Sequence, residues 1–175
     1  LLVHPDGYVL TTHHSLAGMK DVMVEVQSAN GPRYFGTRVV KTHAQHDLAL
    51  LKLLTTERFL FLTLTRPGYR PASQPSLSAL GKTAGGALVR GQGAVVAEGV
   101  RLNIGGRHMT HLLQTDAVHS WEQGGGPLLN DRAEVVGINL VARDENGARR
   151  GYAVPATVIR SHFQDLITFP ARTGT

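Results

Sequence analysis

The sequence has 175 residues, of which 42% are hydrophobic, and this suits one soluble globular domain or two small barrels that share an interface. It contains no cysteine, which excludes disulfides and thiol chemistry, and no apolar run approaches the ~20 residues that a membrane-spanning helix needs. The formal net charge is +5, but the basic residues are scattered and are not interleaved with aromatic ones, which argues against nucleic-acid binding.

The first half of the chain is predicted to consist mainly of β-strands. Residues 7–12 form a β-rich run behind a turn, and residues 21–27 alternate valines with other side chains at a period of two. A further strand is expected at 34–40, and the nearly unbroken apolar run at 48–54 is typical of a buried strand. Residues 66–78 are rich in Pro, Gly and Ser and are predicted to link two halves.

The second half repeats this pattern and then ends in a helix. Strands are predicted at 77–81, 88–98, 111–115, 127–129, 135–141 and 151–154. One helix is expected over 155–166, where one face would carry Val158, Ile159, Phe163, Leu166 and Ile167. Short, regularly spaced strands in two halves favour two packed β-barrels.

Nine histidines are the unusual feature of the composition, because histidine is the commonest side-chain metal ligand and proton carrier near neutral pH. A single histidine is more often a surface or hydrogen-bonded residue, and we interpret five of them in this way: His4, His43, His108, His111 and His119.

Four segments resemble the HtrA family of serine proteases, and they follow the family's order along nearly the whole chain. Residues 5–14 (PDGYVLTTHH) resemble the segment that carries the triad histidine, and residues 46–52 (HDLALLK) the segment with the triad aspartate. Residues 114–130 resemble the region of the nucleophilic serine, and residues 151–155 (GYAVP) the segment before the last helix.

The resemblance implies an all-β protein with two six-stranded β-barrels of the trypsin (chymotrypsin-like) fold and a C-terminal helix. A single domain would cover 1–170, with barrels at about 1–65 and 77–155, the helix at 156–167 and a tail at 168–175. The chain opens within an expected strand, so we expect it to be part of a longer protein.

The resemblance places the triad histidine at His14, the aspartate at Asp47 and the nucleophile at Gly124. A serine protease needs a hydroxyl whose proton the histidine accepts, while the aspartate orients the imidazole. Glycine has no side chain, so the nucleophile is missing. Glu122 stands at the glycine of the oxyanion hole, where a side chain disfavours positive φ and a carboxylate repels the oxyanion. Ser120 lies four residues upstream of the nucleophile position, too far along the loop to replace it.

We therefore expect a degenerate protease that uses its fold for binding. His46 precedes Asp47, and His162 lies in the last helix, which packs close to that loop in the trypsin fold; two imidazoles suit late first-row metals. This combination resembles a protease-like protein of bacterial magnetosomes. The resemblance implies that His46 and His162 bind divalent iron, with nickel, copper or zinc as surrogates, and promote magnetite formation.

The same resemblance implies a location on the magnetosome membrane, with this domain on the lumenal or periplasmic side and the membrane contact made by segments outside the sequence. Other magnetosome proteins or proteases are expected partners. Two alternatives remain open: an HtrA-type serine endopeptidase inactivated by a change at the nucleophile, and a scaffold that binds proteins through the old substrate groove.

Overall fold

The structure is a computed structural model that describes residues 1–71, 76–104, 106–144 and 146–170. The chain forms two compact units, Leu1–Phe61 and Leu62–Thr175, each built around an antiparallel β-sheet. The predicted all-β class with a C-terminal helix is confirmed. Among the described residues, the two sheets have five and seven strands, where two barrels of six strands each were expected.

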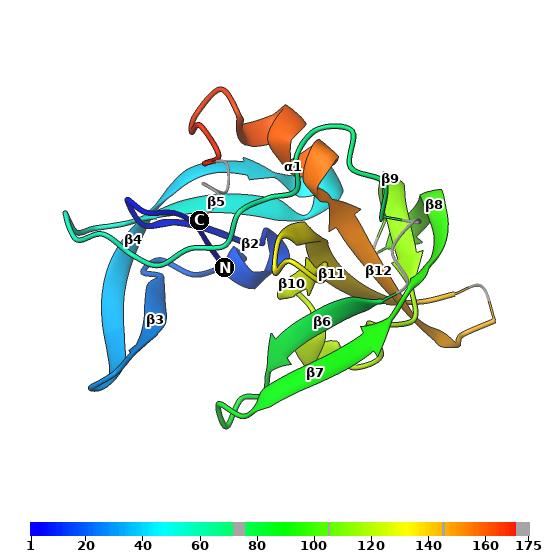
Figure 1. Cartoon of the computed structure of the whole chain (residues 1–175), viewed down its shortest axis with the longest axis horizontal. Helices are drawn as coiled ribbons and strands as arrows, with labels where there is room; N and C mark the ends of the chain where they lie inside the picture. The colour runs from blue at the N-terminus through cyan, green and yellow to red at the C-terminus, as the bar shows by residue number, and fades with distance from the viewer. Residues whose placement is uncertain (72–75, 105, 145, 171–175) are drawn as a thin grey trace. The chain divides into compact units, whose positions relative to one another are not determined.

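The first unit holds a five-stranded sheet in the order β1-β2-β5-β4-β3 (Figure 1, blue to cyan). Its central strand β5 is buried along almost its whole length, as the apolar run predicted. Val9, Leu51, Leu53 and Phe35 form one buried hydrophobic cluster of the unit. The strands are β1 (Leu2–His4), β2 (Tyr8–Thr12), β3 (Met23–Ser28), β4 (Gly31–His43) and β5 (Leu48–Leu53), with 3-10 helices at His14–Leu16 and Ala44–His46.

The second unit holds a seven-stranded sheet in the order β7-β6-β10-β11-β12-β9-β8. Its core includes Leu77, Leu113, Leu128 and Val136. The elements are β6 (Leu77–Lys82), β7 (Leu88–Gly93), β8 (Val95–Ile104), β9 (Arg107–Thr115), the 3-10 helix Trp121–Gln123, β10 (Pro127–Leu129), β11 (Val135–Arg143), β12 (Arg149–Pro155) and α1 (Ala156–Phe163).

The uneven division of the strands has a local cause in the second unit. The single strand expected at 88–98 is interrupted at Ala94, whose N–H donates to the Asp116 carboxylate (2.7 Å) and whose carbonyl accepts from the Thr115 hydroxyl (2.7 Å). These bonds divide the run into β7 and β8, which are the two edge strands of the sheet. Because only Ala94 separates them, the sheet must curl to bring its edges together.

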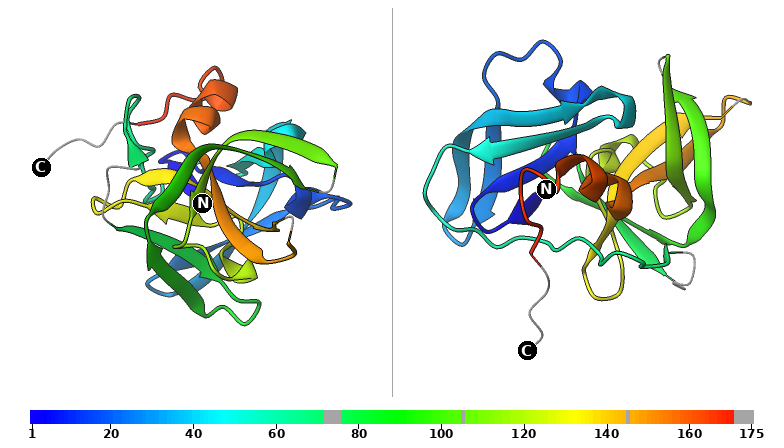
Figure 2. Two further views of the ribbon diagram at one scale, coloured as in Figure 1. Left: turned by 90° about the vertical axis from the view of Figure 1, so that its right-hand side faces the viewer. Right: turned by 90° about the horizontal axis from the view of Figure 1, so that it is seen from above.

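The C-terminal helix is shorter than the predicted 156–167. α1 follows β12 directly and contacts β11 and β12 (Figure 2). It ends at Phe163, and the N–H groups of both Leu166 and Ile167 donate to the Phe163 carbonyl beyond that end. Ile167 is still buried, but Leu166, which was expected on the apolar face, is 39% exposed.

The boundary between the units precedes the predicted linker. Leu64 pairs with Val135, and the Arg160 guanidinium donates to the carbonyls of Leu64 and Thr65, so these residues belong to the second unit. Part of the linker, 72–75, and the end of the predicted tail, 171–175, lie outside the described residues. No helix among the described residues is both long and apolar enough to cross a membrane.

Candidate functional site

The loops that carry His14 and Asp47 meet at one edge of the first unit's sheet. Strands β2 and β5 are antiparallel, with Thr12 opposite Leu48, so the residues after β2 lie beside those before β5. The N–H of His13 donates to the Asp47 carbonyl at 3.0 Å and ties the two loops together. Asp47 adopts left-handed backbone geometry (φ 54°), which aspartate tolerates because its short polar side chain bonds locally.

The Asp47 carboxylate binds His14 twice. One oxygen lies 2.5 Å from His14 Nδ1, and the other accepts the His14 backbone N–H at 2.9 Å. The Asp47 side chain is 3% exposed, whereas that of His14 is 63% exposed. A buried carboxylate thus orients an imidazole that solvent can reach, which is the acid–base half of a serine-protease triad.

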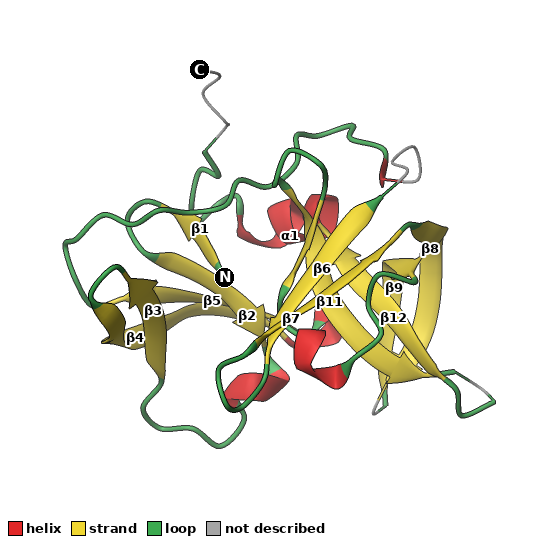
Figure 3. Cartoon of the chain, turned by 60° about the horizontal axis from the view of Figure 1, so that its bottom comes forward, coloured by secondary structure: helices red, strands yellow, loops and turns green. Residues whose placement is uncertain are grey.

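The predicted nucleophile position lies in the second unit, where residues 121–123 form a turn of 3-10 helix (Figure 3). Gly124 follows it with φ −57°, and its N–H donates to the Trp121 carbonyl at 3.0 Å. Glu122 lies within the turn and is not among the residues with positive φ. An oxyanion hole needs backbone N–H groups that point at the substrate. Here the N–H of residue 124 is bonded within its own loop.

Gln123 fixes this loop to the sheet. Its side chain is 0% exposed and makes four hydrogen bonds to backbone groups. Its oxygen accepts the N–H groups of His119 (2.8 Å) and Ser120 (2.9 Å), and its nitrogen donates to the carbonyls of Ala79 (3.2 Å) and Ala117 (3.3 Å). The Ser120 hydroxyl donates to the Glu122 carboxylate, so it is engaged inside the same loop.

His46 lies beside a second histidine that the sequence analysis assigned to the surface. The rings of His43 and His46 stack with centroids 5.1 Å apart and planes 27° from parallel. His46 is buried (8% exposed), and its backbone N–H donates to His43 Nδ1 at 3.3 Å. Burial lowers the pKa of His43 below its ordinary value, and the charge of Lys41 adds to this effect. This shift favours the neutral form of His43.

The sequence contained a signal for this pair. His43 and His46 are three residues apart, and in a 3-10 turn side chains at that spacing lie one above the other. The helix Ala44–His46 supplies such a turn between β4 and β5. The interpretation of His43 as a surface residue missed it because the turn was not predicted.

His162 is a partly buried residue in the last turn of α1, and its ring contacts Phe163 edge-on at 6.4 Å. His14, Asp47 and His46 belong to the first unit, whereas Glu122, Gly124 and His162 belong to the second. The structure thus brings His14 to Asp47 and His43 to His46 within the first unit. Glu122, Gly124 and His162 are each described by their contacts within the second unit.

The sequence is similar to that of known proteins with a trypsin-like domain. The model of the "Trypsin-like peptidase domain" family matches residues 1–138. The "Probable membrane transporter protein MamO" of Magnetospirillum gryphiswaldense is 44% identical over 96% of the chain, and the "Magnetosome formation protease MamE" of Paramagnetospirillum magneticum is 31% identical over 95%. The chain spans 26% of the first relative's length and 23% of the second's.

A solved structure agrees with these sequence relatives. The apo crystal structure of the MamO protease domain from Magnetospirillum magneticum superposes with a TM-score of 0.81 at 43% identity. The match covers 94% of this chain and 86% of that one. The chain belongs to the trypsin-like peptidase domain family.

Proposed function

We propose that the chain is a catalytically inactive trypsin-like pseudoprotease that binds a divalent transition metal, such as iron, and promotes magnetite formation in magnetosomes. The metal ligands in this proposal are His46 and His162, and His43 stacks on His46. The observation that carries it is the stacked, sheltered pair of imidazoles formed by His43 and His46.

The chemistry of this pair fits a late first-row metal. Such metals favour neutral imidazole nitrogens, and protons compete with them for the same lone pair. Burial lowers the pKa of His43 and so favours its neutral form, which does not repel a cation bound next to it. A bound ion would supply a positive charge and vacant coordination positions where further ions or oxygen ligands can collect.

His43 and His46 have different parts in this proposal. The Nδ1 atom of His43 accepts the backbone N–H of His46, which favours the tautomer with a proton on Nε2. Metal binding at that Nε2 would need the proton to move, so His43 orients His46 and is a weak ligand itself. His162 comes from the sequence resemblance and completes the ligand set.

Three features of the loop at 120–124 support catalytic inactivity. Residue 124 carries no hydroxyl. Its N–H is bonded to Trp121, so it does not point at an incoming carbonyl. Glu122 places a carboxylate next to the site where negative charge would develop in the transition state.

The relatives support the location. One is named a membrane transporter and another a magnetosome formation protease, and both are several times longer than this chain. We place the parent protein in the magnetosome membrane, with this domain on the lumenal or periplasmic side. Partners among magnetosome proteins or proteases belong to the same proposal.

Calorimetric titration with Co²⁺ or Ni²⁺ tests the metal site directly. His46→Ala and His162→Ala should each weaken binding by roughly tenfold or more, since losing one of two strong ligands costs at least about 1.4 kcal/mol. His43→Ala should weaken it less, and His108→Ala, which removes an exposed imidazole elsewhere, should leave it unchanged. Equal metal affinity in all four variants would contradict the metal proposal.

The retained His14–Asp47 pair favours one second candidate, an endopeptidase that lacks only its nucleophile. Gly124→Ser separates the two. A β-carbon at residue 124 would lie 3.2 Å from the Trp121 carbonyl, and φ −57° suits serine, so the variant should fold. We expect no peptidase activity on unfolded casein, because the Gly124 N–H is engaged and Glu122 remains. Recovered cleavage would favour the second candidate.

A further inference from the structure

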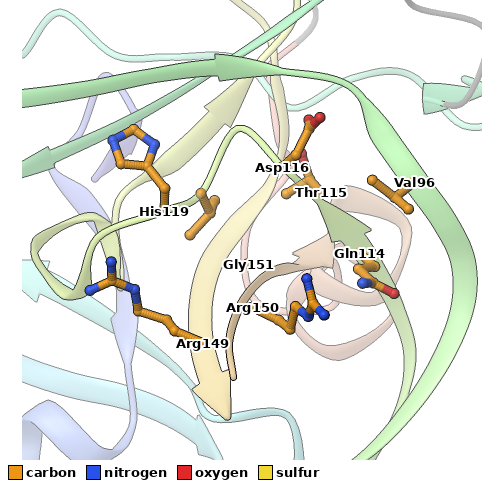
Figure 4. Close-up of a pocket in the computed structure, with 9 residues that line it drawn as sticks. Val96, Gln114, Thr115, Asp116, His119, Arg149, Arg150 and Gly151 are labelled. Carbon is orange, nitrogen blue, oxygen red and sulfur yellow. The ribbon is translucent and has the colours of Figure 1, made fainter. Parts of the chain in front are cut away.

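A pocket of about 310 Å³ opens in the second unit, between the start of β12, the end of β9 and the loop that follows β9 (Figure 4). Its wall is close-packed. A β-carbon at Gly151 would lie 2.1 Å from the Val118 carbonyl, so only glycine lets β12 approach the loop this closely. None of the residues that line the pocket belongs to the histidine pair or to the turn at 121–123.

The pocket is lined by two guanidinium groups, an imidazole and one carboxylate: Arg149, Arg150, His119 and Asp116. The carboxylate is engaged in the fold, since one of its oxygens accepts the Ala94 N–H at 2.7 Å. Arg150 is also engaged, because its Nε donates to Asp144 at 2.9 Å. Arg150 therefore contributes positive charge, while its orientation is set by the neighbouring hairpin.

Arg149 differs from Arg150, because no hydrogen bond or ion pair joins its side chain to any of the described residues. In Figure 4 its guanidinium lies on the same side of the pocket as the His119 ring. That ring is held against β7, where a β-carbon at Gly91 would come within 2.7 Å of His119 Nδ1. The guanidinium of Arg149 and the packed ring of His119 thus lie on one side of the pocket, with Gln114 on the other side.

We propose that this pocket binds a small oxyanion, a phosphate or carboxylate group, with Arg149 and His119 as the hydrogen-bond donors. The planar guanidinium fork matches two oxygens of such a group, and charge-assisted bonds of this kind are the strong ones. A cation is disfavoured, because the lining carries two guanidinium groups against one engaged carboxylate. The site is distinct from the proposed metal ligands and does not depend on them.

Titration of the isotope-labelled protein with inorganic phosphate and, separately, with acetate, at constant ionic strength, tests the proposal by NMR. The amide signals of residues 114–119 and 149–151 should shift with saturation at millimolar concentrations. Arg149→Gln should weaken binding by roughly tenfold, which corresponds to ~1.4 kcal/mol, and His119→Gln by several-fold. Saturation by phosphate alone identifies a phosphate-bearing ligand, and saturation by both anions identifies a carboxylate-compatible site.

Arg101→Gln is the matched control, because it removes the same charge from an exposed position of β8 that does not line the pocket. It should change the affinity less than twofold. The proposal is overturned if neither anion shifts these signals in a saturable way. It is equally overturned if Arg101→Gln weakens binding as much as Arg149→Gln, because the effect would then be general electrostatic attraction.

Discussion

Replacing Gln123 by alanine would test whether one buried side chain holds the loop at the predicted nucleophile position in its present form. The amide makes four hydrogen bonds to backbone groups and is 0% exposed. Each such bond contributes a net ~0.5–1.5 kcal/mol, so the four together amount to about 2–6 kcal/mol. The bonds to His119 and Ser120 are only partly buried, and water can replace them. We therefore expect a loss of about 2–3 kcal/mol.

Urea unfolding followed by circular dichroism measures this loss, because the free energy of unfolding falls linearly with denaturant concentration. Gln123→Glu is the informative second variant. It keeps the size of the side chain and its acceptor oxygen, but turns a second oxygen toward the carbonyls of Ala79 and Ala117. It should destabilise at least as much as alanine, because a buried carboxylate would lack donors on that side.

Gln164→Ala is the control, since Gln164 is exposed and caps α1 only through its backbone. It should change the free energy of unfolding by no more than about 0.5 kcal/mol. If Gln123→Ala costs no more than this control, the four bonds do not stabilise the loop. Hydrogen exchange of the Gly124 amide gives a second readout, and it should accelerate only in the Gln123 variants.

Two further predictions concern the same loop and the histidine pair. Gly81→Ala should destabilise by about 1–3 kcal/mol in the same urea assay, because its β-carbon would lie 2.1 Å from the Glu122 carbonyl; a neutral result would show that the loop moves freely. Burial lowers the pKa of His43, so the unfolded chain binds a proton more readily, and stability should fall as the pH drops below about 6.5. The variant His43→Gln can still accept the His46 N–H and should lose part of this pH dependence. Urea unfolding curves measured between about pH 7 and pH 5 give the slope of the unfolding free energy against pH. An unchanged slope in the variant would refute the reasoning.

Side chains that the sequence left uninterpreted differ in how far they could have been predicted. Tyr152 is buried (3% exposed), whereas Trp121 is 52% exposed. The 3-10 turn at 121–123 buries only its third residue, so Gln123 points inward and Trp121 outward. Nothing in the sequence marks a glutamine as the residue that closes a loop, because its partners lie in other segments.

What the sequence by itself determined rests on local patterns and on residue identity. The period-two alternation and the apolar run at 48–53 depend only on neighbouring residues, so the strands and the all-β class could be predicted from them. The absence of a side chain at Gly124 holds in any fold. The stacking of His43 on His46 was also within reach, since both lie on one short turn.

Only the tertiary structure decided the features whose partners are far apart in the chain. Ala94 interrupts a strand because the side chains of Asp116 and Thr115 bind its backbone groups. The residues next to Ala94 in the sequence do not predict this break. The pocket lined by Arg149 and His119 lies between the loop after β9 and the start of β12, where Gly151 approaches Val118 closely. Hydrogen bonds from side chains to distant backbone groups leave no periodic pattern in the sequence. Their positions therefore depend on how the strands of the sheet come together.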